Sequence, residues 1–272
     1  MVEYSYQTIV VEKEDGLTTI TLNRPEKRNA MSPQLHREMY SVLSELRFDK
    51  ETRVVVITGA GESFCAGQDL KQYFIEMESQ PERVKEEIRS ISRVWRNEMI
   101  RTLPQPVIAS INGWCFGGAF TIVTACDIAI AAEEAIFGLS EVNFGAFPGG
   151  EVTSVLTEHL QPKHALFYAL TGDTFDGKEA HRIGLVTKAV PRSQLENETR
   201  KIAQNLAQKD ARALKAVKEA WYHTFYSNPD VAYEIASLIF ERLKYEQGGR
   251  PGIQQFTNKE YRPGLGAYKW EK

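Results

Sequence analysis

The sequence has few cysteines and no large excess of either charge. Its 272 residues include three cysteines, 33 basic side chains and 36 acidic side chains, for a formal net charge of −3. Three cysteines cannot all pair with one another, and none belongs to a CxxC motif, so no disulfide framework is expected. A slightly acidic chain has no general attraction for nucleic acid or for anionic lipid. We therefore expect no nucleic-acid partner.

Long hydrophobic runs are also missing. The longest nearly apolar run, Ala119–Ala132, contains Asp127 and is shorter than the roughly 20 residues that span a bilayer. The opening segment MVEYSYQTIVVEKED lacks the basic and apolar stretches of a signal peptide. These absences predict a cytoplasmic protein without a membrane partner.

The common motifs for nucleotides, serine nucleophiles and metals are incomplete. Gly59-Ala60-Gly61 is followed by Phe64 where a dinucleotide fingerprint needs its third glycine, and no GK[ST] completes a P-loop. Gly138-Leu139-Ser140 continues to Val142, which rules out a GxSxG turn. The five histidines show no zinc-ligand spacing. We expect neither a metal nor a redox cofactor.

The three cysteines, Cys65, Cys115 and Cys126, leave two interpretations open. Cys65 and Cys115 belong to the glycine-bearing segments described below, where a nucleophile could act. Neither has a histidine nearby in the sequence, and small buried cysteines are common. Reduced, buried thiols are therefore favoured over a catalytic thiol.

Apolar strand-like runs alternate with helix-like segments, which predicts an α/β fold. A hairpin is expected from Thr8–Glu12 and Leu17–Leu22, followed by a helix with Ser32 as its N-cap and Pro33 at its first position. Further strands are expected at Arg53–Thr58, Pro106–Ile111, Asp127–Ala132 and Leu185–Val190. The rest of the chain has a helical pattern, including a helix at Val231–Tyr245. We divide it into a core, residues 1–191, and a helical region with the C-terminal tail, residues 192–272.

Two glycine-bearing segments, Phe64–Tyr73 (FCAGQDLKQY) and Asn112–Thr121 (NGWCFGGAFT), each follow a predicted strand and lead into a predicted helix. Glycine permits close approach of the backbone to a ligand, and the first amides of a helix lack internal acceptors. Two such turns side by side can direct two N–H groups at one oxygen, as in an oxyanion hole. We predict the Gln68 and Gly118 amides as its donors. The alternative is that Gly117-Gly118 only permits tight packing.

These segments, together with NRPEKRNAM (Asn23–Met31) and FGLSEV (Phe137–Val142), resemble the crotonase (enoyl-CoA hydratase/isomerase) family from about Thr8 to the C-terminus. The pieces GWCFGGAFT, FGLSEVNFG and the tail RPGLGAYK are most similar to its hydroxycinnamoyl-CoA hydratase-lyases. The resemblance implies a spiral of ββα units and a C-terminal helical trimerisation region, giving trimers or dimers of trimers. Coenzyme A would be part of the substrate.

The resemblance also implies catalytic roles. Glu141 corresponds to the family's catalytic glutamate, and burial in a partly dry pocket would suit it to proton transfer. Thr121 stands where many family hydratases carry a second catalytic glutamate, and the hydratase-lyases are similar to this chain in having Ser or Thr there. By local structure alone, Thr121 could instead be a helix residue bonded back to a carbonyl.

The predicted substrate contacts follow from the same resemblance. Tyr73 would bind a 4-hydroxyl group at the far end of an aromatic acyl group, with Ser140 as a further polar contact. Phe144 and Gly149 would shape a flat pocket. The lyases place a second tyrosine near the position of Ile235 in this sequence, and Tyr233 lies two residues away on the predicted helix.

For coenzyme A, the resemblance points to six positions in two groups. They are Lys27, Arg28 and Ala30, and Ala66, Asp69 and Leu70. The cationic side chains suit phosphates, although a charged turn of this kind is also common on a solvated surface. The predicted activity is hydration and cleavage of a 4-hydroxycinnamoyl thioester. Alternatives are an enoyl-CoA hydratase or isomerase for another acyl chain, and a catalytically weak scaffold of the same fold.

Overall fold

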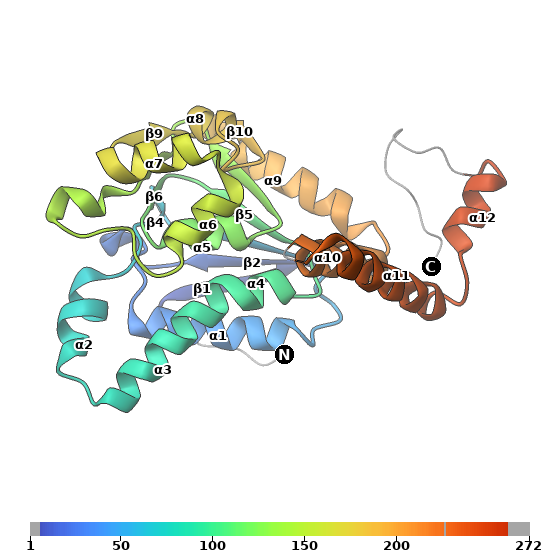
Figure 1. The fold of residues 1–272 in the computed structure, drawn as a ribbon, viewed down its shortest axis with the longest axis horizontal. Coiled ribbons are helices and arrows are strands. Elements are labelled where there is room, and N and C mark those ends of the chain that lie inside the picture. Colours follow the sequence, from blue (N-terminus) through green and yellow to red (C-terminus); the bar gives the residue numbers. More distant parts are fainter. Residues whose placement is uncertain (1–5, 226, 261–272) are drawn as a thin grey trace.

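Two β-sheets form the centre of the molecule (Figure 1). This computed structural model describes residues 6–225 and 227–260, so the tail motif RPGLGAYK lies outside the described residues. The large sheet contains, in spatial order, β1 (Ile9–Glu14), β2 (Leu17–Leu22), β3 (Val54–Gly59), β5 (Val107–Ile111), β7 (Ile128–Ala132) and β10 (Lys188–Val190). The small sheet contains β4 (Ser63–Cys65), β6 (Trp114–Phe116), β8 (Ile136–Gly138) and β9 (Thr174–Asp176).

The large sheet begins with the predicted hairpin and continues as a parallel sheet. β1 and β2 are antiparallel and joined by Asp15-Gly16, both with positive φ, as a tight hairpin turn requires. From β2 onward all neighbours are parallel. β5 is buried along its whole length, as expected for a parallel strand covered on both faces.

The helices of the core follow the strands in sequence. They are η1 (Pro25–Lys27), α1 (Pro33–Leu46), η2 (Leu70–Ile75), α2 (Glu76–Glu78), α3 (Glu82–Arg93), η3 (Val94–Met99), α4 (Ile100–Thr102), α5 (Ala119–Ala125), η4 (Ser140–Phe144), α6 (Val152–His159), α7 (Pro162–Thr171), α8 (Gly177–Arg182) and α9 (Arg192–Ala207). The predicted start of α1 is confirmed, because the Ser32 hydroxyl accepts a hydrogen bond from the Leu35 amide at 3.2 Å.

A short strand of the small sheet separates each predicted strand from its glycine turn. β3 is followed by β4, β5 by β6, and β7 by β8, before the chain enters η2, α5 and η4 respectively. This strand–strand–helix unit, repeated three times, is the ββα spiral, so the predicted fold is confirmed. The sequence patterns alone did not indicate these short strands. A three-residue strand carries too little apolar periodicity to be recognised in the sequence.

The helices after β10 differ in whether they contact the large sheet. α9 packs against β3, β5 and β7, although it follows Pro191. α10 (Ala211–Phe225) and α11 (Pro229–Glu246) pack against each other and extend to the right in Figure 1, with α12 (Pro251–Thr257) beyond them. The division at residue 191 stays a prediction, and the projecting part of the described chain begins with α10.

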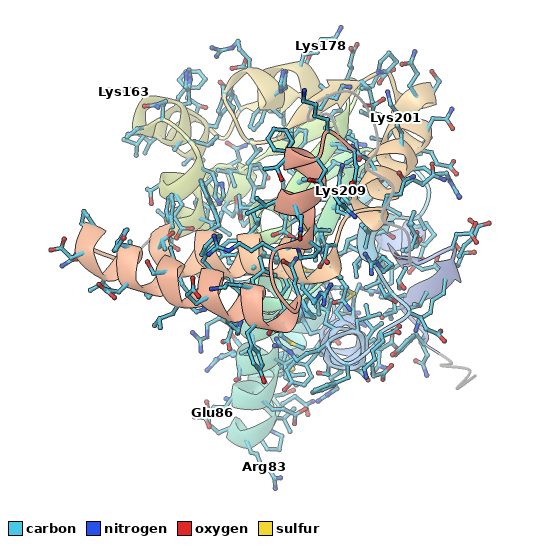
Figure 2. The ribbon with its side chains drawn as sticks, turned by 90° about the vertical axis from the view of Figure 1, so that its right-hand side faces the viewer. Arg83, Glu86, Lys163, Lys178, Lys201 and Lys209 are labelled. Carbon is cyan, nitrogen blue, oxygen red and sulfur yellow. The ribbon has the colours of Figure 1, made fainter. Side chains whose placement is uncertain are left out.

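Charged side chains project outward from both ends of the view in Figure 2. In Figure 2, Arg83 and Glu86 project from α3 at one end, and Lys178 projects from α8 at the opposite end. None of the helices built from the described residues combines the length and apolar character that a membrane span requires.

Candidate active site

Three neighbouring strands of the small sheet bring the predicted catalytic residues together. β4, β6 and β8 are parallel, so their carboxyl ends meet at one edge of the sheet. Gln68 follows β4, Gly118 follows β6 and Glu141 follows β8. All three line one cavity of about 950 Å³.

The backbone around Gln68 is held so that its own amide faces away from its neighbouring strand. Met31 forms a parallel bridge with Gln68: the Met31 amide donates to the Gly67 carbonyl at 2.8 Å, and the Asp69 amide donates to the Met31 carbonyl at 3.0 Å. Alternate amides of an extended segment point in opposite directions. The Gln68 N–H therefore points away from Met31, and no acceptor for it is found in residues 6–225 or 227–260.

The turn that carries Gly118 lies against the turn that carries Gln68. Gly67 has a φ of +87°, and a Cβ there would lie 2.8 Å from the Phe116 carbonyl oxygen and 3.3 Å from the Gly118 nitrogen. Only glycine allows this approach. Within the described part of the chain the Gly118 amide also has no acceptor. The structure thus brings the two predicted donors to one cavity wall with both N–H groups unused.

Glu141 lies in η4 and faces the same wall. A Cβ at Gly117 would lie 2.6 Å from Glu141 Oε1, so the absence of a side chain there makes room for the carboxyl group. The other oxygen, Oε2, is buried and has no hydrogen-bond partner among the described residues. Burial raises the pKa of the Glu141 carboxyl above its ordinary value of 4.5. A carboxyl group in this environment is suited to exchanging a proton with a bound substrate.

A buried histidine, which the sequence analysis missed, fixes the Gln68 side chain. The Trp95 indole N–H donates to His36 Nδ1 at 2.9 Å, so Nε2 carries the imidazole proton and faces Gln68 Oε1 at 2.8 Å. The Gln68 amide group in turn donates to Ser92 Oγ at 3.2 Å. Burial, the main cause, and the nearby Arg96 lower the pKa of His36 to about 3, so the ring is neutral. Its only sequence signal is a histidine within an apolar helical face.

Thr121 does not line the cavity. Its side chain is fully buried, and its hydroxyl donates to the Gly118 carbonyl at 2.7 Å. Arg96 Nη1 donates to the same hydroxyl at 2.9 Å. A catalytic role for Thr121 stays a prediction, and its side chain does not reach the cavity. The structure shows the helical back-bond of the alternative interpretation, and Arg96, which lines the cavity, is bonded to the same hydroxyl.

Four of the five predicted substrate contacts line the cavity: Tyr73, Ser140, Phe144 and Gly149. Tyr233 does not. It lies on α11 with 71% of its surface exposed, and α11 packs on α10 rather than over the cavity of its own chain. Sequence spacing cannot show which way a terminal helix projects.

The predicted coenzyme A positions are also divided. Arg28, Ala66 and Leu70 line the cavity, and the Arg28 guanidinium lies 4.6 Å from the centre of the Trp114 ring. Lys27, Ala30 and Asp69 do not line it. The Asp69 carboxylate is bound by Arg24 at 3.0 Å and caps η2 at the Gln72 amide, so its side chain has a structural role.

The three cysteines are free and buried. Burial raises the pKa of Cys65 to about 12, and it also raises the pKa values of Cys115 and Cys126. The thiolate is therefore suppressed at neutral pH, which supports the interpretation of structural thiols. Across the described ranges, no group of three or more His, Cys, Asp or Glu side chains is arranged to hold a metal ion.

A fold of this kind, with two amides unpaired among the described residues and a half-buried carboxyl at one cavity, is typical of enzymes that stabilise an enolate oxygen. The family model for enoyl-CoA hydratase/isomerase matches residues 12–263. The chain therefore belongs to the enoyl-CoA hydratase/isomerase, or crotonase, family, as the sequence motifs predicted.

Several named relatives are similar over nearly the whole chain. The hydroxycinnamoyl-CoA hydratase-lyase of Pseudomonas fluorescens is 45% identical, with 98% of each protein covered. A probable enoyl-CoA hydratase of Rhodobacter capsulatus is 34% identical, covering 94% of this chain and 96% of the relative. The crystal structure of an enoyl-CoA hydratase from Bacillus anthracis has a TM-score of 0.81 at 32% identity and covers 93% of this chain and 97% of that chain. The expectation of an enzyme of the lyase class that acts on acyl-CoA thioesters is confirmed.

Proposed function

We propose that the protein hydrates a 4-hydroxycinnamoyl-CoA thioester and then cleaves the product to an aromatic aldehyde and acetyl-CoA. The observation that carries this proposal is the convergence of the Gln68 amide, the Gly118 amide and the half-buried Glu141 carboxyl on one cavity. The 45% identity to a hydroxycinnamoyl-CoA hydratase-lyase supports this choice of substrate within the family.

The first step adds water across the double bond. The thioester oxygen accepts hydrogen bonds from the two amides, which draws electrons from C3. Glu141 takes a proton from water as the water oxygen bonds to C3, and the Glu141 carboxyl then gives that proton to C2 of the resulting enolate. Each such donor is worth roughly 2.7–4 kcal/mol when it meets the developing charge.

The second step reverses an aldol addition. Glu141, again a carboxylate, takes the proton of the 3-hydroxyl, the C3–O bond becomes a carbonyl, and the C2–C3 bond breaks. The electron pair of that bond forms the enolate of acetyl-CoA, whose oxygen the same two amides stabilise. Glu141 returns the proton to C2. Neither step oxidises or reduces the substrate, so the proposal includes no cofactor.

The cavity walls are consistent with a flat aromatic acyl group. Tyr73, Phe116, Phe144 and Phe147 all line the cavity, and the Tyr73 hydroxyl provides a polar group for a para-hydroxyl. Hydration of another acyl chain is the second candidate, because several relatives are named enoyl-CoA hydratases. Retention of the catalytic groups argues against an inactive scaffold.

Incubation with feruloyl-CoA tests the proposal. We expect an aromatic aldehyde and acetyl-CoA in equal amounts, measured by liquid chromatography and mass spectrometry, with no product from the saturated thioester. Loss of the double bond without aldehyde would identify a plain hydratase. No reaction with feruloyl-CoA or with short enoyl thioesters would favour the scaffold.

A trimer or a dimer of trimers in the cytoplasm is part of the same proposal. The support is the exposed apolar surface of α10 and α11, where Val217 and Trp221 are 69% and 62% exposed. Apolar surface of this extent on paired helices is typical of an interface between protein chains.

A further inference from the structure

Arg96 is a buried cation beside the proposed oxyanion hole. It belongs to η3, is 7% exposed and lines the catalytic cavity. It forms no ion pair with any carboxylate of residues 6–225 and 227–260, although an isolated charge is costly to bury. Tyr73 and Glu151 act on it electrostatically, but no carboxylate of the described residues is close enough for an ion pair, so the cation favours negative charge in the cavity.

The hydrogen bonds of Arg96 leave one side of its guanidinium group free. Nε donates to the Ser92 carbonyl at 2.9 Å, and Nη1 donates to Thr121 Oγ1 at 2.9 Å and to the Gly118 carbonyl at 3.3 Å. These bonds hold the group in one orientation. Nη2 has no acceptor in the described part of the chain, so it remains available to a ligand in the cavity.

Consecutive residues of one turn place this cation near the catalytic carboxyl. A Cβ at Gly117 would lie 2.6 Å from Glu141 Oε1, and a Cβ at Gly118 would lie 3.3 Å from Arg96 Nη1. The Gly118 amide, which would bind the thioester oxygen, lies in the same turn. Glu141 and Arg96 thus lie on either side of the proposed oxyanion position. C2 and C3 of a bound thioester must lie next to that position.

We propose that Arg96 is a further catalytic residue, whose guanidinium group donates a hydrogen bond to the oxygen on C3 during carbon–carbon cleavage. This inference rests on the proposed function. When Glu141 removes the proton of the 3-hydroxyl, negative charge develops on that oxygen before it passes through the breaking C2–C3 bond to the enolate. Arg96 stabilises the charge while it is on the C3 oxygen, and the amides of Gln68 and Gly118 stabilise it once it is on the enolate oxygen.

The test supplies the 3-hydroxy-3-(4-hydroxyphenyl)propanoyl thioester of coenzyme A directly and follows aldehyde release. For Arg96→Gln we expect kcat to fall on the order of 100-fold, the effect of losing one preorganised donor, while KM changes less than about threefold. Arg96→Lys keeps the charge and should recover part of kcat. Arg93→Gln is the matched control, since Arg93 is exposed one turn earlier and should leave kcat unchanged.

A second measurement separates catalysis from structure. The 3-deoxy analogue, which lacks the oxygen on C3, should bind the wild type and Arg96→Gln with equal Kd. A parallel loss of affinity for this analogue would show a structural role and overturn the proposal. An increase in KM with kcat retained, or cleavage by Arg96→Gln within threefold of wild type, would overturn it as well.

If Arg96→Gln does not fold, Arg96→Lys carries the same test, with a lower kcat at unchanged KM expected and a higher KM at unchanged kcat contradicting it. A wild type that releases no aldehyde would overturn the proposed function together with this role. A wild type that cleaves beside an equally active Arg96→Gln would overturn the role alone.

Discussion

At the scale of single residues, the chemistry depends on polar groups at the cavity that lack hydrogen-bond partners among the described residues. Glu141 Oε2 is buried and has no hydrogen-bond partner among the described residues, although buried polar groups are usually satisfied. The Gln68 and Gly118 amides have no acceptor in the same part of the chain. Each of them faces or borders the same cavity. A substrate oxygen and its proton would supply the missing partners, so the cost of leaving them unpaired in the free protein contributes to recognition of the reacting atoms.

Replacement of Glu141 by Gln tests the acid/base role. We expect kcat to fall by about 10²–10⁴-fold, the usual contribution of a positioned acid/base group, with little change in stability. In the wild type, kcat/KM should decline as pH falls through the raised pKa of Glu141, because only the carboxylate accepts a proton. This acidic limb should therefore lie above pH 4.5 and be absent from Glu141→Gln.

The pH profile of kcat/KM for both proteins is the measurement, with the thermal unfolding midpoint as the control for folding. A Glu141→Gln protein that keeps the turnover number of the wild type would remove Glu141 from the mechanism.

Sequence reasoning found the residues carried by short motifs and missed those assembled by tertiary contacts. Gln68, Gly118 and Glu141 were predicted because their motifs resemble a family and follow strand ends. His36 and Arg96 have no motif; they reach the site because α1 and η3 pack over the glycine turns. Thr121 occupies a motif position, but its hydroxyl is bonded to Arg96 and to the Gly118 carbonyl rather than facing the cavity.

At the scale of elements, the ββα unit explains why the site forms. In each unit, a long strand pairs within the large sheet, and the three-residue strand that follows pairs within the small sheet and positions the turn after it. The long strands and α1 were predictable, because burial gives them a continuous apolar run or a helical period. The short strands were not, since their register depends on partner strands that are distant in the sequence, from 22 to 51 residues away.

Gly67→Ala tests the contact between the two turns. The new Cβ would meet the Phe116 carbonyl and the Gly118 nitrogen, which should move the two donors apart and lower kcat by about 10²–10³-fold. Steady-state kinetics on the thioester substrate measure this effect.

Gly248→Ala is the matched control for backbone strain. Gly248 also has positive φ, +68°, but a Cβ there would have nothing within 4 Å. This variant should lose stability by roughly 1 kcal/mol and keep its turnover number. Equal activity of the two variants would show that close contact between the turns is not required.

At the scale of the whole molecule, few of the described residues cover the projecting pair α10 and α11. Its exposed apolar residues include Val217, Trp221, Leu238 and Phe240. Tyr233 lies on the same pair, away from the cavity of its own chain. An assembly that buries this surface would account for its composition.

Light scattering coupled to size-exclusion chromatography tests the assembly. We expect a mass of three or six chains for the wild type and a shift to smaller species for Trp221→Glu, because a buried charge is costly at an apolar interface. Lys163→Glu, on α7, changes an outward-facing charge and should leave the mass unchanged. A monomeric wild type would contradict the assembly.

The central claim is that two main-chain amides polarise a thioester carbonyl. Isotope-edited infrared spectroscopy of a carbonyl-¹³C-labelled 4-hydroxycinnamoyl thioester, bound to the slow Glu141→Gln protein, tests it most directly. The account predicts a carbonyl stretch at lower frequency than in water, returning toward the free value when Gly67→Ala is added. A bound carbonyl with the frequency of the free thioester would contradict it.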